Sequence, residues 1–232
     1  MQFAQKKPAV GLLIFDLDGT LIDSRTDLVL SVNATLEYLC RPQLHDETIC
    51  SYVGEGAPTL IRRAIGAGYT EEEAARGLDF FLRYYRKHKL DNTRLYPGVP
   101  ETLERLANGH GSKRRILAVL TNKPEYVSWE ILEELDLNRL FRVVYGGNSF
   151  PTKKPDPLGA HRILRDTGVA AGAAMMVGDS DVDIQTGINA GTWTCGVTYG
   201  IGTLELESNP PDLLVHSLPE LAAALDSHKS SA

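Results

Sequence analysis

Three short apolar runs, each followed at once by polar or acidic residues, constrain the fold more than any other feature of this sequence. The runs and the residues after them are 10–15 (V-G-L-L-I-F) before Asp16, 116–120 (I-L-A-V-L) before Thr121-Asn122, and 173–177 (A-A-M-M-V) before Gly178-Asp179. Each run is apolar at successive positions, which is typical of parallel strands buried on both faces. These runs therefore predict an α/β fold built on a parallel sheet.

Helical patterns alternate with strand candidates from about residue 94 onward. The expected helices are 126–135, 156–167, 184–190 and 218–225, and the weaker strand candidates are 142–145, 192–198 and 213–215. Gly168 and Gly191 stop two of these helices. Alternation of strand and helix favours a doubly wound sheet, so we assign residues 1–22 and 94–232 to one α/β core domain.

The segment 23–93 has almost no strand signal and is expected to be all-helical. Leucine and valine recur at helical spacing near its start, a second helix covers 57–65, and Thr70 with Glu73 forms a capping-box pattern that opens a long helix. We therefore predict a helical domain, 23–93, inserted directly after the first strand.

Composition and charge exclude several classes of protein. The chain has 232 residues, a formal net charge of −6 and no Lys/Arg-rich run, so a nucleic-acid partner is not expected. The stretch 1–8 carries no apolar signal core, and no apolar run approaches the roughly 20 residues of a membrane span. The tail 227–232 is expected to fray. These features predict a soluble protein without membrane association.

The three cysteines, Cys40, Cys50 and Cys195, do not form a C-x-x-C pair, and their odd number argues against a disulfide framework. Reduced thiols are typical of a cytosolic protein, so we expect a cytoplasmic location.

Five acidic residues follow the first and third apolar runs. They are Asp16, Asp18, Asp179, Asp181 and Asp183. Because ligands of open α/β sheets bind beyond the carboxyl ends of the strands, we expect most of these carboxylates to meet at one sheet edge. A divalent cation would compensate their mutual repulsion, and Mg²⁺ prefers such oxygen ligands. Asp179 and Asp181 are also suited to cap the following helix, and Asp181 is expected to cap or to face solvent.

Hydrogen-bond donors at the same edge predict a phosphoryl ligand. Thr121 and Asn122 supply a hydroxyl and an amide, and Lys153 or Lys154 supplies a positive charge. One aspartate can then attack phosphorus, while a second protonates the leaving oxygen and later activates water.

Four stretches in order resemble the four motifs of the haloacid dehalogenase-like hydrolases. They are 15–21 (F-D-L-D-G-T-L), Thr121-Asn122, Lys154-Pro155 and 178–183 (G-D-S-D-V-D). The segment 23–93 is similar to the C1 cap of that superfamily. The resemblance implies a Rossmannoid core with a helical cap, and an Mg²⁺-dependent phosphatase that forms an aspartyl-phosphate intermediate.

The resemblance also implies a role for each matching acidic residue. Asp16 resembles the nucleophile and Asp18 the general acid/base, whose presence is typical of enzymes that act on phosphate monoesters. The implied Mg²⁺ ligands are Asp16, the backbone carbonyl of Asp18, and Asp179. Asp183 resembles the partner that holds metal-bound water.

Thr121, Asn122 and Lys154 resemble the phosphate binders of the family. Lys153 is the competing lysine, and Lys154 is preferred because it directly precedes the proline.

A narrower resemblance, to the phosphoglycolate phosphatases, rests on five stretches. They are 52–58 (Y-V-G-E-G-A-P), 96–99 (Y-P-G-V), 120–124 (L-T-N-K-P), 154–158 (K-P-D-P-L) and 196–200 (G-V-T-Y-G). The cap of such enzymes selects the substrate, and Glu55 and Arg62 are the expected cap residues for a small phosphorylated metabolite. Arg63 neighbours Arg62 and points elsewhere around the same helix.

Several alternatives remain open at this level. Phosphatases of pyrophosphate, sugar phosphates or nucleotides, and a sugar-phosphate mutase, share much of the pattern. A phospho-accepting signalling module also groups acidic residues, a threonine and a lysine around magnesium, but it retains its aspartyl phosphate. The sequence is compatible with a monomer or a homodimer.

Overall fold

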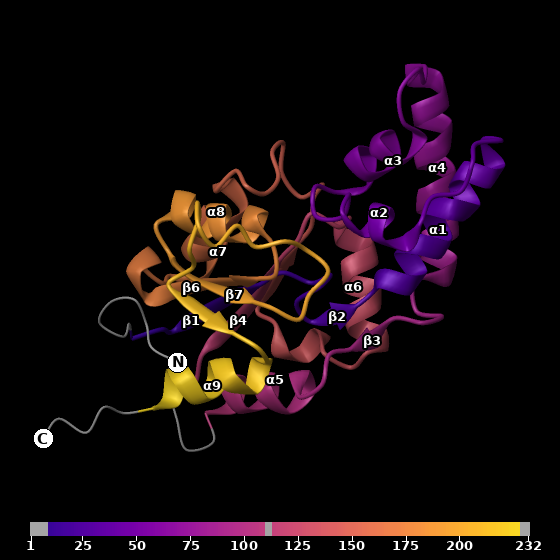
Figure 1. The fold of residues 1–232 in the computed structure, drawn as a ribbon. Helices are drawn as coiled ribbons and strands as arrows, with labels where there is room; N and C mark the ends of the chain where they lie inside the picture. The colour runs from indigo at the N-terminus through magenta and orange to yellow at the C-terminus, as the bar shows by residue number, and fades with distance from the viewer. Residues whose placement is uncertain (1–8, 110–112, 228–232) are drawn as a thin grey trace, which may run out of the picture.

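The computed structural model describes residues 9–109 and 113–227, so residues 1–8 and the tail 228–232 considered above lie outside it. Its centre is a parallel six-stranded sheet with the order β5-β4-β1-β6-β7-β8 (Figure 1). The strands are β1 (Leu12–Phe15), β4 (Ile116–Leu120), β5 (Val143–Tyr145), β6 (Ala174–Gly178), β7 (Trp193–Val197) and β8 (Leu213–Val215). The predicted parallel sheet is confirmed.

The three apolar runs form the middle of this sheet. β1 lies between β4 and β6, and Phe15 is in register with Val119 on one side and with Val177 on the other. After β5 the chain crosses back over β1 to reach β6, so the strand order reverses there. Such a reversal opens a crevice beyond the carboxyl ends of the strands, where ligands of these folds bind.

Alternate residues of β1 are buried against helices on opposite faces of the sheet. Leu12 and Ile14 belong to the hydrophobic cluster that includes residues of α7 (Leu158–Thr167), whereas Leu13 and Phe15 belong to the larger cluster on the other face. Figure 1 shows α7 and α8 (Asp181–Ala190) on one side of the sheet and α5 (Val99–Asn108) and α9 (Leu218–Asp226) on the other. The doubly wound prediction is therefore confirmed.

The segment 24–93 is mostly helical, as expected, and lies to one side of the sheet (Figure 1). Its helices are α1 (Arg25–Tyr38), α2 (Asp46–Cys50), α3 (Ala57–Ile65) and α4 (Glu71–His88). We call them the helical insertion. Two short antiparallel strands, β2 (Ile22–Asp23) and β3 (Arg94–Leu95), pair where the chain enters and leaves it.

Helix α4 begins at the predicted cap, but the capping box is only half formed. The Thr70 side chain accepts a hydrogen bond from the Glu73 backbone N–H at 3.1 Å. The Glu73 carboxylate is instead bound by the Arg41 guanidinium through two 2.9 Å hydrogen bonds. An arginine from the neighbouring loop therefore takes the place of the reciprocal backbone contact.

The remaining helices complete the α/β half of the molecule. These are α6 (Glu125–Glu134) and the short 3-10 turns η1 (Asn138–Leu140) and η2 (Ala171–Ala173). None of the helices in the described part of the chain is both long and apolar enough to cross a bilayer.

Candidate active site

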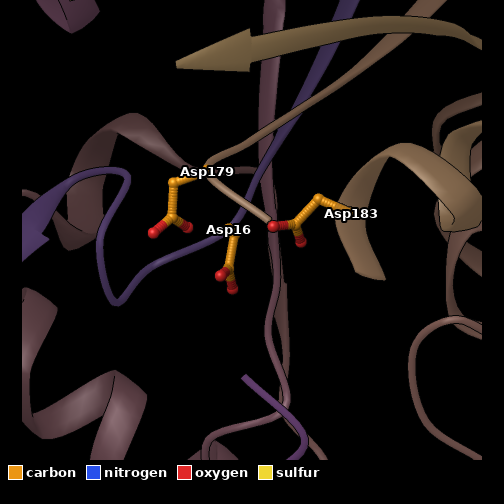
Figure 2. Close-up of side chains that lie close together, drawn as sticks. All are labelled: Asp16, Asp179 and Asp183. Carbon is orange, nitrogen blue, oxygen red and sulfur yellow. The ribbon is translucent and has the colours of Figure 1, made fainter. Parts of the chain in front are cut away.

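Three buried carboxylates meet at the carboxyl edge of the sheet. Asp16 follows β1, Asp179 follows β6 and Asp183 lies in the first turn of α8, and each offers an oxygen within 4.8 Å of the other two. Figure 2 shows the three side chains converging from separate segments of the chain. Their exposed fractions are only 8%, 3% and 0%. The predicted convergence of Asp16 and Asp179 is therefore present in the structure.

The burial of these charges is electrostatically unfavourable. Burial, opposed by the charge of Lys154 and reinforced by the charges of Asp183 and Asp18, raises the pKa of Asp16 to about 6. Burial also raises the pKa of Asp179 to about 7, together with the charges of Asp183 and Asp16. A hard cation bound by the carboxylate oxygens would stabilise the ionised forms, so the donor set fits Mg²⁺.

A buried lysine, Lys154, sits beside two of these three carboxylates. The Lys154 ammonium lies 2.8 Å from an Asp16 oxygen and 2.6 Å from an Asp183 oxygen. Although burial opposes ionisation, the charges of Asp16 and Asp183 raise the pKa of Lys154 above its ordinary value. The Lys153 ammonium instead donates to the backbone carbonyl of Glu55 in the helical insertion. Of the two candidate lysines, Lys154 is the one beside Asp16.

Thr121 and Asn122 line the same cavity as Asp16. The Thr121 hydroxyl accepts a hydrogen bond from the Lys123 backbone N–H at 3.2 Å. The Asn122 amide donates to the Lys154 carbonyl at 3.0 Å and to the Gly54 carbonyl at 2.8 Å. The Asn122 side chain thus joins the helical insertion to the sheet edge in this conformation.

Asp18 has a different set of partners. Both of its carboxylate oxygens lie 2.9 Å from the Lys123 ammonium, and Ser24 donates a hydroxyl hydrogen bond to it at 2.5 Å. The Lys123 ammonium also donates to the Tyr85 hydroxyl of α4 at 2.8 Å. Sequence reasoning did not identify Lys123, although its place directly after Thr121-Asn122 was the available signal.

Asp179 is held by backbone groups from the loop after β7. Its Oδ2 accepts hydrogen bonds from the N–H groups of Ile201 at 2.8 Å and Gly202 at 2.7 Å. Gly19 packs directly against this carboxylate at a φ of +82°, where a Cβ atom would lie 2.0 Å from Oδ2. Glycine is therefore required at position 19 both by the backbone conformation and by the space that Asp179 occupies.

The cap of α8 corrects one sequence expectation. Ser180, not Asp179 or Asp181, is the N-cap residue, and Asp183 completes a capping box with it. The Ser180 hydroxyl donates to the Asp183 carboxylate at 2.6 Å. Asp181 is partly exposed at the first helical position. The capping box also fixes Asp183 at the carboxylate cluster.

The two residues expected to select the substrate pair with other side chains of the segment 24–93. The Arg62 guanidinium bonds to Glu71 at 2.9 Å, and the Glu55 carboxylate pairs with Arg63 at 2.5 Å. All four side chains are at least 41% exposed. Neither Glu55 nor Arg62 lines the cavity over Asp16 in this conformation, and their role stays a prediction.

A cavity lies between the sheet edge and the helical insertion. Its floor includes Asp16, Asp18 and Asp179, and its roof comes from α1, the loop before α3, α3 itself and α4. The roof is largely apolar, with Leu28, Leu60 and Phe81 among its residues. A small anionic ligand in this cavity would have its charged end on the floor and its organic end against the roof.

Comparison with known proteins identifies the family. The model of the haloacid dehalogenase-like hydrolases matches residues 13–197, which include Asp16, Asp179 and Asp183 of the carboxylate cluster. The chain belongs to the haloacid dehalogenase-like hydrolases. The match also spans the helical insertion, so the family resemblance covers both halves of the molecule.

Its relatives within this family are phosphatases. A phosphoglycolate phosphatase of Pseudomonas syringae pathovar tomato is 42% identical over 217 residues, which are 90% of this chain and 76% of the relative. A phosphoglycolate phosphatase of Aquifex aeolicus is 35% identical over 94% of this chain and 97% of its own. The prediction that this haloacid dehalogenase-like hydrolase is a phosphatase, and thus a phosphoric monoester hydrolase, is confirmed.

A solved structure supports the same fold assignment. The crystal structure of a predicted phosphoglycolate phosphatase from Haemophilus somnus superposes with a TM-score of 0.86 at 33% sequence identity. The superposition covers 93% of this chain and 97% of the other. The haloacid dehalogenase-like fold expected from the sequence is therefore confirmed.

Proposed function

We propose that this chain is a magnesium-dependent phosphatase of small metabolites that works through an aspartyl-phosphate intermediate and acts on 2-phosphoglycolate. The observation that carries the proposal is the meeting of Asp16, Asp179, Asp183 and Lys154 at one sheet edge. The substrate is supported by the relatives named phosphoglycolate phosphatases, at 35–42% identity.

Asp16 and Asp179, with the backbone carbonyl of Asp18, would hold the magnesium ion, and Asp183 would hold its bound water. The bound ion would supply positive charge that keeps Asp16 ionised and withdraws charge from the phosphoryl oxygens. Lys154 adds a second positive charge beside Asp16, and Thr121 and Asn122 supply donors for the remaining phosphoryl oxygens.

The chemical steps use the two first-strand aspartates in turn. An Asp16 oxygen attacks phosphorus, forming the Asp16 O–P bond, while the P–O bond to the alcohol breaks and Asp18 gives its proton to that oxygen. Asp18, now ionised, takes a proton from water. The water oxygen attacks phosphorus, the Asp16 O–P bond breaks, and inorganic phosphate leaves.

The division into domains follows the paired strands at the entry to the helical insertion. Residues 1–22 and 94–232 form the core and residues 23–93 the cap in this proposal. Support comes from the β2–β3 pair, which brings the two crossing points together, and from α1–α4, which lie to one side of the sheet. A cap over Asp16 would exclude water from the first step.

The roof of the cavity supports a small substrate. Tyr85 is the one residue with a polar side chain that the helical insertion contributes to the described lining. A sugar or nucleotide would bury hydroxyl or base groups against apolar residues there, which costs free energy when hydrogen bonds are lost. This argues against sugar-phosphate and nucleotide substrates and against a sugar-phosphate mutase.

The proposed setting is the cytoplasm, with no nucleic-acid or membrane partner. Cys40, Cys50 and Cys195 are free thiols in the structure, in keeping with a reducing compartment. For the oligomeric state, we propose a monomer or a homodimer.

The test is a panel of phosphate esters, including 2-phosphoglycolate, assayed for released phosphate with magnesium and with a chelator. We expect magnesium-dependent hydrolysis, with 2-phosphoglycolate preferred over sugar phosphates, nucleotides and pyrophosphate. Asp16→Asn should abolish turnover and Asp18→Asn should reduce it nearly as far. The phosphatase mechanism is wrong if a folded, magnesium-binding protein hydrolyses no ester, or if both variants keep near-normal rates.

A further inference from the structure

Lys123 is a buried cation whose ammonium lies between the proposed acid/base and α4. Its side chain is only 4% exposed, yet the residue lines the cavity over Asp16. The ammonium lies 2.9 Å from both oxygens of Asp18, donates to the Tyr85 hydroxyl at 2.8 Å, and stands 4.4 Å from the centre of the Tyr85 ring. It is the one basic side chain among the residues described as lining this cavity.

The distance between the Lys123 ammonium and Asp18 limits the length of the substrate that this ammonium can contact. In the proposed reaction Asp18 hydrogen-bonds the leaving oxygen, so the Lys123 ammonium lies one further hydrogen bond away, within roughly 5–6 Å of that oxygen. In a two-carbon phosphorylated acid, a carboxylate oxygen is about 3 Å from the ester oxygen. One hydrogen bond of about 2.8 Å then spans the remaining distance to the ammonium.

Among the other residues described as lining the cavity, none has a positively charged side chain to pair with a second negative charge. The helical insertion contributes mainly apolar residues to the lining, with Leu28, Leu60 and Phe81 among them. Arg62, which the sequence suggested for a carboxylate, is 49% exposed and paired with Glu71. A carboxylate on the leaving group would therefore be buried without a charged partner unless it contacts Lys123.

We propose that Lys123 and the Tyr85 hydroxyl form a carboxylate subsite, which selects phosphate monoesters whose alcohol is a short 2-hydroxy acid. This inference rests on the proposed phosphatase function and assigns its specificity to a lysine of the sheet edge and a tyrosine of the helical insertion. Because Tyr85 belongs to α4, the subsite is complete only when the helical insertion lies over the sheet edge as it does here.

The test compares substrates that differ only in the carboxylate. We would measure kcat/KM for 2-phosphoglycolate and for ethyl phosphate in the wild type, Lys123→Met, Tyr85→Phe and Lys87→Met. Lys87 is an exposed lysine of α4 and serves as the matched control. Loss of a charged hydrogen bond should lower the ratio of the two kcat/KM values by about 10- to 100-fold in Lys123→Met, with a smaller drop in Tyr85→Phe. Lys87→Met should keep the wild-type ratio.

A binding measurement keeps the test independent of turnover. We would titrate the same proteins, with magnesium, with 3-phosphonopropionate and with propylphosphonate, which replace the bridging oxygen by carbon and differ in the carboxylate alone. The Kd for 3-phosphonopropionate should rise about 10- to 100-fold in Lys123→Met, while the Kd for propylphosphonate stays within about twofold. If Lys123→Met does not fold, the same two Kd values measured for Tyr85→Phe test the subsite instead.

Failure of this inference differs from failure of the proposed function. If both substrates lose rate equally in Lys123→Met and Tyr85→Phe keeps the wild-type ratio, Lys123 acts only on Asp18 and the subsite is refuted. Equal affinity for the two phosphonates in the wild type also refutes it. A wild type that hydrolyses no ester refutes the proposed function instead, and the phosphonate titrations then decide the subsite alone.

Discussion

Replacing Asp179 by asparagine should stabilise the metal-free protein while removing its response to magnesium. Asp179 is 3% exposed, and its pKa rises from the ordinary value of 3.8 to about 7 because of burial and the charges of Asp183 and Asp16. Each pKa unit corresponds to 1.36 kcal/mol, so ionising this group in the folded state costs on the order of 4 kcal/mol above pH 7. Because Asp16 and Asp179 titrate as an interacting pair, we expect a gain of ~2–4 kcal/mol.

The sign of the pH dependence follows from the direction of the pKa change. The raised pKa means that the folded state binds a proton more tightly than the unfolded state does. The penalty is therefore absent below about pH 4, grows as the pH rises toward 7, and is complete above pH 7. The wild type in chelator should thus lose stability between pH 5 and pH 8, and Asp179→Asn should lose much less.

Asparagine keeps the local hydrogen bonds that matter for folding. Its amide oxygen can still accept from the N–H groups of Ile201 and Gly202. Urea unfolding at pH 5 and pH 8, in chelator and in excess magnesium, measures the free energy of unfolding directly. Magnesium should stabilise the wild type and leave Asp179→Asn almost unchanged. Glu207→Gln, at an exposed position in the same loop region, is the charge-matched control.

One outcome would refute this reasoning. If Asp179→Asn is less stable than the wild type at pH 8 in chelator and shows the same pH profile, the buried carboxylates do not repel one another as the structure implies. Asp179 would then be a structural acceptor for the loop after β7, and the metal site would lose its electrostatic basis.

Three further perturbations test other parts of the structure. Gly19→Ala places a Cβ atom 2.0 Å from an Asp179 oxygen at a φ of +82°, so calorimetric titration should show weakened magnesium binding and urea unfolding should show a loss of ~2 kcal/mol or more. Asp27→Asn disturbs a carboxylate that accepts hydrogen bonds from Asn92 and Thr93, so unfolding at pH 7 should show a loss of ~1–3 kcal/mol. Lys154→Met leaves the Asp16 and Asp183 charges without their buried partner, so unfolding in chelator should show a loss of ~3–5 kcal/mol at pH 8.

Each of these expectations has a clear contrary result. A Gly19→Ala protein with wild-type magnesium affinity would mean that the Asp179 loop adapts freely. An unchanged unfolding midpoint in Asp27→Asn would show that this buried carboxylate contributes nothing at the base of the helical insertion. Equal stability of Lys154→Met and wild type would show that Asp16 and Asp183 are compensated by some other group.

The sheet was predictable because its signals are local and strong. Successive apolar residues in 116–120 and 173–177 identify buried strands without any knowledge of their neighbours. The family resemblance then supplied the order of the four motifs. The short pair β2 and β3 escaped prediction, since each strand has two residues and exists only through the partner across the insertion.

Helix α5 was missed although its end signals are present. Gly98 and Pro100 lie at its start, and Gly109 in the left-handed conformation ends it. Its buried positions Val99, Thr102, Leu103 and Leu106 also recur at helical spacing. Periodicity and capping signals are therefore sufficient to predict this helix from the sequence.

Some contacts of the site were predictable from the sequence and others were not, for a physical reason. Asp16 and Asp179 follow strands, so their meeting depends only on the sheet order. The contact of Lys123 with Tyr85, unlike its ion pair with Asp18, depends on how the helical insertion lies over the sheet edge. No periodicity in the chain encodes that placement, because it joins a side chain of the helical insertion to one of the sheet edge.

The paired strands β2 and β3 have a consequence for how such a chain can change over time. Because the two crossing points are neighbours, the sheet needs only a short closed connection there, whatever length of polypeptide lies beyond it. A longer segment between β2 and β3 adds little loop-closure entropy, about 0.6 kcal/mol for each doubling of its length. The phosphate-handling floor can therefore be kept while the roof is lengthened, shortened or exchanged, which gives one scaffold access to many alcohol leaving groups.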